Sequence, residues 1–308
     1  MNIDWKGILL WSNQCYGICA VLLALASNLL VLHTVPDIFI LLFIHLTTVL
    51  YYTHAYLVEF KEGIYNDRSV WYQKHKIYLR YRQLAFTFLC IYIGVFKLNI
   101  LKVVYSTRLE FKIYLIITLL LSFVYYLPTL NQKIPNLLRN NGIFKSFSIA
   151  WVWTITTCFI PVWFSTETKK GSLFISDILL IYSAQVFLFI LVLAILFDIK
   201  DIYKDSNENV NTLVVKLGIL KTINRIIVPL LIINAILVLS LFCISKLSVL
   251  YVLSELIVLV LTYIVSRVVV HIKSIHANII LIDGLIVLKA ILSICCFIIC
   301  NFVPTVKT

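Results

Sequence analysis

The sequence predicts an all-α, polytopic membrane protein. Of its 308 residues, 62% are hydrophobic and 13% are charged, whereas soluble domains have about 45–50% apolar and about 25% charged residues. The mean hydropathy is +1.01, and several apolar runs reach the roughly 20 residues that a helix needs to cross a bilayer. These observations exclude a disordered chain, a collagen, a coiled coil and almost every class of soluble enzyme.

Nine segments of the chain meet or approach the requirements for a spanning helix, so we expect a nine-helix bundle that forms one transmembrane domain over residues 1–308. A membrane β-barrel is excluded because its strands would be about ten residues long with alternating polarity. The expected spans are 8–32, 38–58, 77–96, 111–130, 144–164, 173–197, 226–245, 247–266 and 279–303.

Polar residues within these spans are informative. Arg80 and Arg82 lie in the first turns of the third span, so their side chains must reach back to the interface or the span must begin later. Asn13 in the first span is expected to face the bundle interior. Asp283 and Lys289 in the ninth span are costly to bury, and their offset of six residues predicts no direct pair. We place Asp283 near an interface.

The basic charge balance orients the bundle. The net charge is +12, and Lys and Arg are about twice as frequent in the loops on the N-terminal side as in those on the other side. We therefore expect a protein of a bacterial-type inner membrane with a cytoplasmic N-terminus, and no nucleic-acid partner. The loops after spans two and six then face the same compartment and can form one site.

The strongest motif lies at the end of the sixth span. Asp198, Asp201 and Asp205 are spaced i, i+3, i+7 and share one face of a continuing helix. Three such carboxylates repel one another, and a divalent cation offsets this repulsion. Hard oxygen ligands suit Mg²⁺, which binds a few carboxylates together with substrate phosphates. The alternative is a solvated helix end that is neutralised by Lys200 and Lys204.

A second acidic motif follows the second span. Glu59 and Glu62 lie on one helix face, and His54 lies two turns before Glu62, with Val58 between them. This arrangement is similar to half of a divalent metal site, and a pair of interfacial glutamates is the alternative.

Basic residues accompany both motifs. Arg68 and Lys74 lie in an aromatic-rich stretch after the second span, and both side-chain types bind diphosphate oxygens. The alternative is an interfacial segment that binds anionic lipid. Lys145 at the start of the fifth span faces the same side, either as part of the site or as an interfacial anchor.

The motif after span six resembles the second aspartate-rich motif, DxxDxxxD, of the UbiA superfamily of intramembrane prenyltransferases. The segment 211–218, NTLVVKLG, is similar to the family's continuation, with Val214 in place of a proline. The family's first motif, NxxxDxxxD, is degenerate here: His54 on its Asn puts Val58 and Glu62 on its aspartates, and Glu59 on the first aspartate is the other placement. The nine expected spans also match the family.

The resemblance implies transfer of an isoprenyl group from a polyprenyl diphosphate to a lipophilic acceptor, such as an aromatic quinone precursor, with Mg²⁺-assisted departure of diphosphate. Asp198, Asp201, Asp205, Glu59 and Glu62 would be the catalytic metal ligands. The substrate-binding candidates are His54, Arg68, Lys74, Lys145, Lys216 and Asn13. Some of the 19 Phe, 17 Tyr and 6 Trp residues would shield the allylic cation.

Two other functions remain open. The first is a non-catalytic relative that binds isoprenoid or lipid, which the irregular first motif favours. The second is a small-molecule transporter, which would require internal repeats and spans that are broken near the midplane. The prenyl chain length, the acceptor, the number of metals and the oligomeric state are not specified by the sequence.

Overall fold

The computed structural model describes residues 7, 11–58, 67–130, 142–167, 176–202, 206, 212–245, 247–272 and 275–302. These residues form α-helices, short π-helical turns and one 3₁₀ turn, with no strand among them. In chain order the elements are α1 (Gln14–Leu32), α2 (Ile38–Val58), α3 (Asp67–Lys74), α4 (Lys76–Tyr92), η2 (Ile93–Lys97), α5 (Ile100–Ser106), α6 (Leu109–Leu130), α8 (Gly142–Thr154), η3 (Ile155–Phe159), α9 (Ile160–Glu167), α10 (Asp177–Lys200), α12 (Leu213–Leu217), α13 (Ile219–Thr222), η4 (Ile223–Ile227), α14 (Val228–Ser245), α15 (Val249–Val268), η5 (Val269–His271) and α16 (Ile275–Phe302).

Six helical segments of the described chain are long and apolar enough to cross a membrane, and the count rises to seven if α4–η2 and α5, which meet at a 55° bend, form one span. The helix Ile38–His54 is apolar but shorter. Each of the nine expected segments contains a helix, although the described residues 12–13, 176 and 247–248 lie just outside the helices, and the count of nine spans stays a prediction. The coarser prediction is confirmed: the described chain is all-α, with the helices of a polytopic membrane protein.

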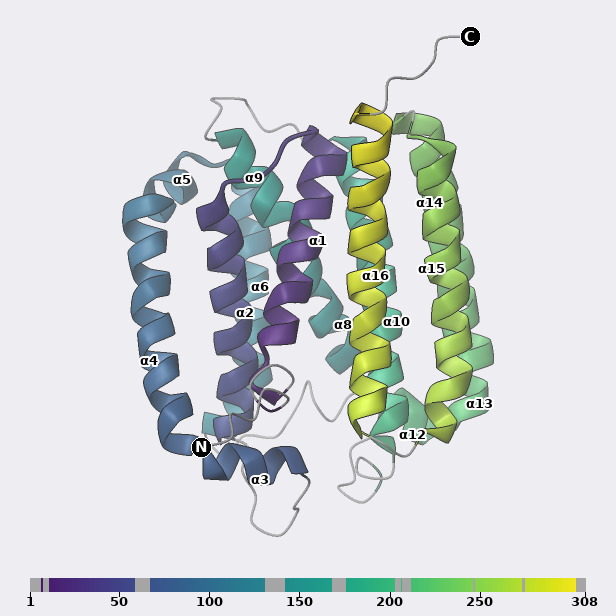
Figure 1. Ribbon diagram of the computed structural model, residues 1–308, viewed down its shortest axis with the longest axis horizontal. Helices are drawn as coiled ribbons and strands as arrows, with labels where there is room; N and C mark the ends of the chain where they lie inside the picture. Colours follow the sequence, from purple (N-terminus) through teal and green to yellow (C-terminus); the bar gives the residue numbers. More distant parts are fainter. Residues whose placement is uncertain are drawn as a thin grey trace.

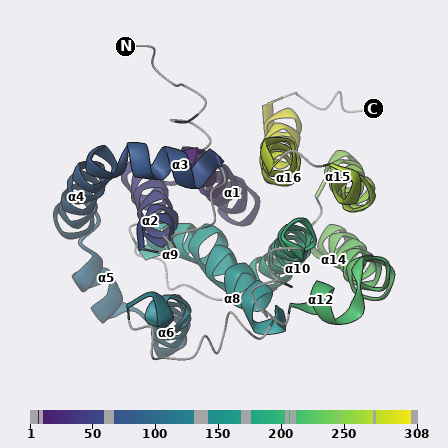
Figure 2. The same ribbon diagram turned by 90° about the horizontal axis from the view of Figure 1, so that it is seen from below.

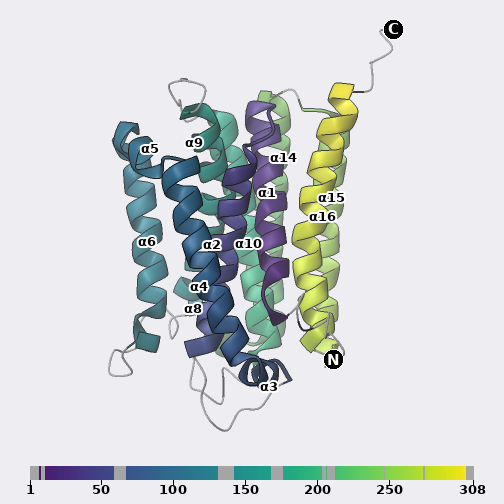
Figure 3. The ribbon, with the colours of Figure 1, turned by 60° about the vertical axis from the view of Figure 1, so that its left-hand side comes forward.

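The long helices run alongside one another, and the short helix α3 lies across one end of the bundle (Figures 1 and 3). Seen from that end, α3 extends from α4 toward α1 (Figure 2). The short helix α12 lies at the same end, where α10 finishes (Figure 1). We call this the α3 end of the bundle.

Local side-chain caps set several helix starts. Ser176 accepts a hydrogen bond from the amide of Leu179 at 3.2 Å and begins α10. Thr212 caps α12 in the same way, and Gly218, with a φ of 79°, ends that helix in a backbone conformation that favours glycine. Ser248 caps α15 by accepting a hydrogen bond from the amide of Tyr251.

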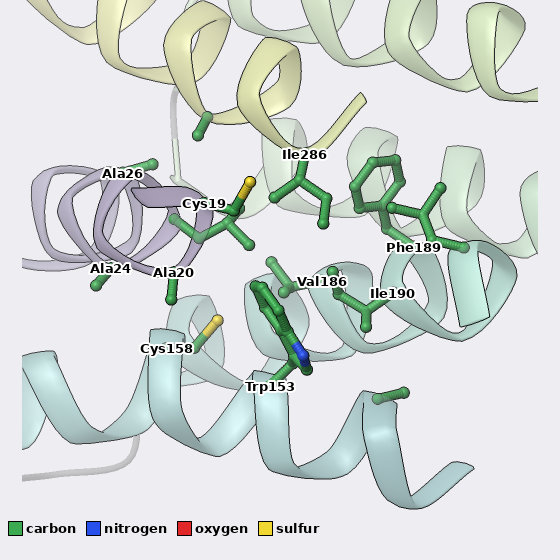
Figure 4. Packing of buried hydrophobic residues seen from close by; sticks show 14 of the residues in the cluster. Cys19, Ala20, Ala24, Ala26, Trp153, Cys158, Val186, Phe189, Ile190 and Ile286 are labelled. Atoms are coloured by element: carbon green, nitrogen blue, oxygen red, sulfur yellow. The ribbon is translucent and has the colours of Figure 1, made fainter. Parts of the chain in front are cut away.

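The core is built where α1 meets α10, α8 and α16. Small α1 residues such as Ala20 and Ala24 are fully buried and allow close helix approach. Figure 4 shows Val186 of α10 between Trp153 of α8 and Ile286 of α16. Close packing of this kind replaces the hydrophobic effect as the force that holds helices together in lipid.

A buried ion pair joins the C-terminal helices. The carboxylate of Glu255 in α15 accepts hydrogen bonds from the ammonium of Lys289 in α16, from Gln185 in α10 at 3.0 Å and from Ser293 at 2.9 Å. Glu255 and Lys289 are each 1% exposed. Tyr251 donates to the side-chain oxygen of Gln185 at 3.2 Å, which extends the network. The partner of Lys289 is therefore on another helix, consistent with the absence of a pair to Asp283.

Candidate functional site

Asp198 lies in the last turn of α10 and is buried, with 1% of its side chain exposed. The ammonium of Lys145 in α8 contacts its Oδ1 at 2.6 Å, and the hydroxyl of Ser146 donates to its Oδ2 at 3.0 Å. Both carboxylate oxygens are thus held by α8. We call Asp198, Lys145 and Ser146 the Asp198 cluster.

Asp201 is the residue that ends α10, and its amide donates to the carbonyl of Phe197 at 3.0 Å. Its side chain is 42% exposed and lies 3.7 Å from the ammonium of Lys200. The motif was open to two interpretations, a metal site or a helix end that is neutralised by lysines. Lys200 neutralises Asp201 in this way, whereas Asp198 is paired with Lys145 instead.

The two described aspartates supply carboxylate oxygens, the ligand type that Mg²⁺ takes in ones or twos together with phosphate oxygens. Within the described ranges, no group of three or more His, Cys, Asp or Glu side chains is placed to hold a metal ion. The other expected ligands, Glu59, Glu62 and Asp205, lie outside the described residues. A cation at Asp198 would have to replace the ammonium that now contacts Oδ1.

The second cluster is built around Arg68, which α3 carries into the bundle, where it is 7% exposed. Its Nη2 donates to the Oδ1 of Asn13 and, at 3.4 Å, to the carbonyl of Trp11. Its guanidinium carbon lies 3.9 Å from the centre of the Tyr56 ring. Burial acts to lower the pKa of Arg68, but the surrounding tyrosines, Tyr56 first, outweigh it and the pKa lies above its ordinary value. The group is therefore a fixed positive charge.

Asn13 is the hub of this Arg68 cluster. Its Nδ2 donates to the hydroxyl of Tyr72 at 2.8 Å and to that of Thr53 at 3.3 Å, while its Oδ1 accepts from Arg68. Its backbone has a φ of 65° at the start of α1. The amide is thus engaged by the protein, so Asn13 positions Arg68. Burial raises the pKa of Tyr72, opposed by the nearby Arg68, and keeps its hydroxyl neutral.

Arg82 also turns inward, because its Nη2 donates to the carbonyl of Ser12 at 3.0 Å and to the hydroxyl of Thr53 at 3.2 Å. The arginine that was expected to reach for the interface therefore ties α4 to α1 and α2. Arg80 is exposed and lines a groove of about 670 Å³ between α2 and α4, together with His54. The structure places His54 in this groove rather than with the side chains that hold Asp198.

The two remaining basic candidates are exposed. Lys74 ends α3, and Lys216 lies in α12. Both helices are at the α3 end of the bundle (Figure 1). These lysines add positive charge to the end that holds both clusters, but the structure brings neither into contact with Asp198.

Aromatic side chains lie between the helices that carry the two clusters. Tyr16 of α1 stacks on Tyr52 of α2 with 4.5 Å between ring centres, and the indole of Trp153 in α8 donates to the hydroxyl of Tyr52 at 2.8 Å. This aromatic wall links α1, α2 and α8. Nothing in the sequence indicated which aromatic residues lie together, and the fold identifies these three.

No protein-family model, curated protein or solved structure gives a significant match to this chain. Its function therefore has to be argued from its own residues.

The importance of two buried acids, Glu255 and Asp283, does not follow from the sequence reasoning alone. Glu255 was not singled out, although a single acid within an apolar span is a signal in itself. Asp283 lies at 5% exposure inside the bundle, near enough to Arg68 and Lys200 for both to attract it electrostatically. Asp283 therefore lies toward the α3 end of the bundle. Its side chain is buried rather than solvated.

Proposed function

We propose that this chain is a nine-span intramembrane prenyltransferase, which moves an isoprenyl group from a polyprenyl diphosphate to a lipophilic acceptor. The observation that carries the proposal is the placement of two charged clusters at one end of an apolar bundle. Asp198 and Asp201 end α10, and α3 brings the buried Arg68 to the same end. A molecule with a charged diphosphate and an apolar tail suits this combination.

The diphosphate would be bound by the basic side chains of this end. Arg68 has a planar fork that matches phosphate oxygens, and its Nε has no hydrogen-bond partner among the described residues. Lys145 is a second cation, released from Asp198 when a metal binds there. Mg²⁺ held by Asp198 and Asp201 would act as a Lewis acid on the departing diphosphate.

In the transfer, the bond between C1 of the isoprenyl group and the diphosphate oxygen breaks, and the electron pair leaves with the diphosphate. The π electrons of the acceptor ring form the new carbon–carbon bond, and the ring then loses a proton to the released diphosphate or to solvent. The aromatic wall of Tyr16, Tyr52 and Trp153 would stabilise the allylic cation through its ring faces.

A non-catalytic isoprenoid-binding protein is the second candidate. The contact between Lys145 and Asp198 favours it, because the carboxylate is already neutralised by the protein. Val58, which stands where one alignment of the first motif has an aspartate, also favours it. Both candidates bind the diphosphate, and only the transferase breaks its bond to the isoprenyl group.

The test is Mg²⁺-dependent release of pyrophosphate from geranylgeranyl diphosphate by the detergent-purified chain, with a chelator control. We expect Asp198→Asn to reduce release about a hundredfold or more. Asp177→Asn is the matched control, because Asp177 is an exposed acid at the opposite end of the same helix. Release should be unaffected by this change.

The variant Asp198→Asn removes the negative charge that Lys145 contacts, so the double variant Asp198→Asn, Lys145→Met separates a folding defect from loss of the site. A double variant that is stable but inactive supports the transferase. Diphosphate binding without release by the wild type identifies a binder, and restoring an aspartate with Val58→Asp then tests for a gain of activity. Absence of both binding and release would refute both candidates.

A further inference from the structure

Asp283 in α16 differs from the other buried carboxylates of the described chain. Asp198 is held by Lys145 and Ser146, and Glu255 is held by Lys289 and its neighbours. Both side-chain oxygens of Asp283 lack a hydrogen-bond partner among the described residues, although the side chain is only 5% exposed.

The surroundings of Asp283 contain positive charge that does not reach it. Arg68 and Lys200 both act on the carboxylate electrostatically, yet within the described chain neither forms an ion pair with it within 4.0 Å. The Nε of Arg68 is itself without a partner. The carboxylate of Asp283 on α16 and the Nε of Arg68 on α3 therefore both lack a hydrogen-bond partner among the described residues, at the same end of the bundle.

The turn of α16 that carries Asp283 packs against α1. The thiol of Cys19 in α1 contacts the backbone carbonyl of Asp283 at 3.9 Å. Tyr16, which stacks on Tyr52, lies three residues before Cys19 on α1. The aromatic wall and Asp283 are therefore brought together by the packing of α1 on α16.

Burying a carboxylate without a partner costs several kcal/mol, and such a group is retained inside a membrane bundle chiefly for function. Its natural partner is a group that donates a hydrogen bond and arrives with an apolar ring or tail. No group of three His, Cys, Asp or Glu side chains surrounds it within the described ranges, so a hydroxyl or an amine is a simpler partner than a metal ion.

We propose that Asp283 accepts a hydrogen bond from the hydroxyl or amino group of the lipophilic acceptor and so selects acceptors that carry such a group. This inference rests on the proposed transferase function. Asp283 is then a specificity-determining binding residue, which fixes the ring of the acceptor beside Tyr16 and Tyr52.

The first test needs no ligand. If Asp283 has no hydrogen-bond partner in the free protein, Asp283→Leu should raise the Tm of the purified chain by at least about 2 °C, because a buried, unsatisfied polar group is removed. The matched control is Asp198→Leu, which removes a buried carboxylate that is held by Lys145 and Ser146 and should lower the Tm. A lower Tm for Asp283→Leu would show that the carboxylate is structural, and the inference would be wrong.

The second test uses 2-naphthol and 2-methoxynaphthalene as acceptor probes, with geranylgeranyl diphosphate as the donor. The wild type should alkylate the naphthol in preference to its methyl ether. Asp283→Leu should raise the KM for 2-naphthol about tenfold to a hundredfold and abolish the preference. Gly284→Ala, where the added methyl meets no atom within 4 Å, should behave as wild type. An unchanged KM in Asp283→Leu would overturn the inference.

A third test separates the two proposals. Dicyclohexylcarbodiimide is an apolar reagent that labels carboxyl groups in apolar surroundings, and mass spectrometry locates the label. We expect labelling of Asp283 that 2-naphthol suppresses and 2-methoxynaphthalene does not. If the wild type releases no pyrophosphate but this protection is seen, the transferase proposal fails and the binding role of Asp283 stands. Equal effects of the two naphthalenes would refute that role.

Discussion

The buried pair of Glu255 and Lys289 predicts a large and strongly non-additive loss of stability. In Lys289→Met, the carboxylate keeps hydrogen bonds from Gln185 at 3.0 Å and from Ser293 at 2.9 Å but loses its counter-charge. In Glu255→Gln, the ammonium loses its counter-charge and keeps an amide oxygen and the face of Phe189, at 5.3 Å from the ring centre.

Removing one partner of a buried ion pair costs about 3–5 kcal/mol. Because two hydrogen bonds to the carboxylate survive in Lys289→Met, we place that variant at the lower end, about 3 kcal/mol. A desolvated cation–π contact is worth about 2 kcal/mol or more and offsets only part of the lost ion pair, so Glu255→Gln should lie at the upper end, about 5 kcal/mol. The double variant leaves no net charge in the core, and its cost should be smaller than the sum by at least about 3 kcal/mol.

The assay is unfolding of the detergent-purified chain by titration with sodium dodecyl sulfate, followed by circular dichroism. Lys97→Met is the matched control, because Lys97 also lies over an aromatic ring, that of Phe39, at 5.2 Å, but is exposed. Its cost should stay within about 0.5 kcal/mol. Additive costs for the two single variants would refute the reasoning, since they would mean that the charges do not depend on each other.

Two further changes test close helix packing and the Arg68 cluster. Gly17→Ala should destabilise the chain by about 1–3 kcal/mol, because the new methyl carbon would lie 2.5 Å from Nδ1 of His45. Gly284→Ala, with open space around it, should be neutral or stabilising by up to about 1 kcal/mol. Equal effects of the two changes on the SDS unfolding midpoint would contradict the packing argument. Asn13→Ala should weaken geranylgeranyl diphosphate binding about tenfold, because Arg68 loses its Oδ1 partner. Calorimetric titration measures this, and an unchanged Kd would mean that Asn13 does not position Arg68.

The sequence predicted the helical segments well because length and apolarity decide them. The second expected span, 38–58, coincides with α2 (Ile38–Val58). Asp198 with Lys145, and Asn13 with Arg68, were candidates before their contacts were seen. The short helix α3 was not predicted, since its low apolarity gives no spanning signal and its place depends on Arg68 reaching Asn13 and Tyr56.

Contacts between distant spans could not be predicted from one sequence. Residue spacing states which side chains share a helix face, but not which helix faces them. Lys289 and Glu255 are 34 positions apart, and nothing in their own spans relates them. The inward turn of Arg82 was missed for the same reason, because its acceptors, Ser12 and Thr53, lie on other segments.

The π-helical turns η2, η3 and η4 have a consequence for the history of the chain. Each of these five-residue turns lies within or at the end of a longer helical segment, and each has the geometry of one extra residue absorbed by an α-helix. Such a residue shifts the assignment of the following residues to helix faces by one position, which is about 100°. In η3 this separates the face that presents Lys145 and Ser146 to Asp198 from the face that α9 presents. Single-residue gaps in an alignment with divergent relatives should therefore fall inside these turns, and a deletion there would misalign the site while leaving the hydropathy of the span unchanged.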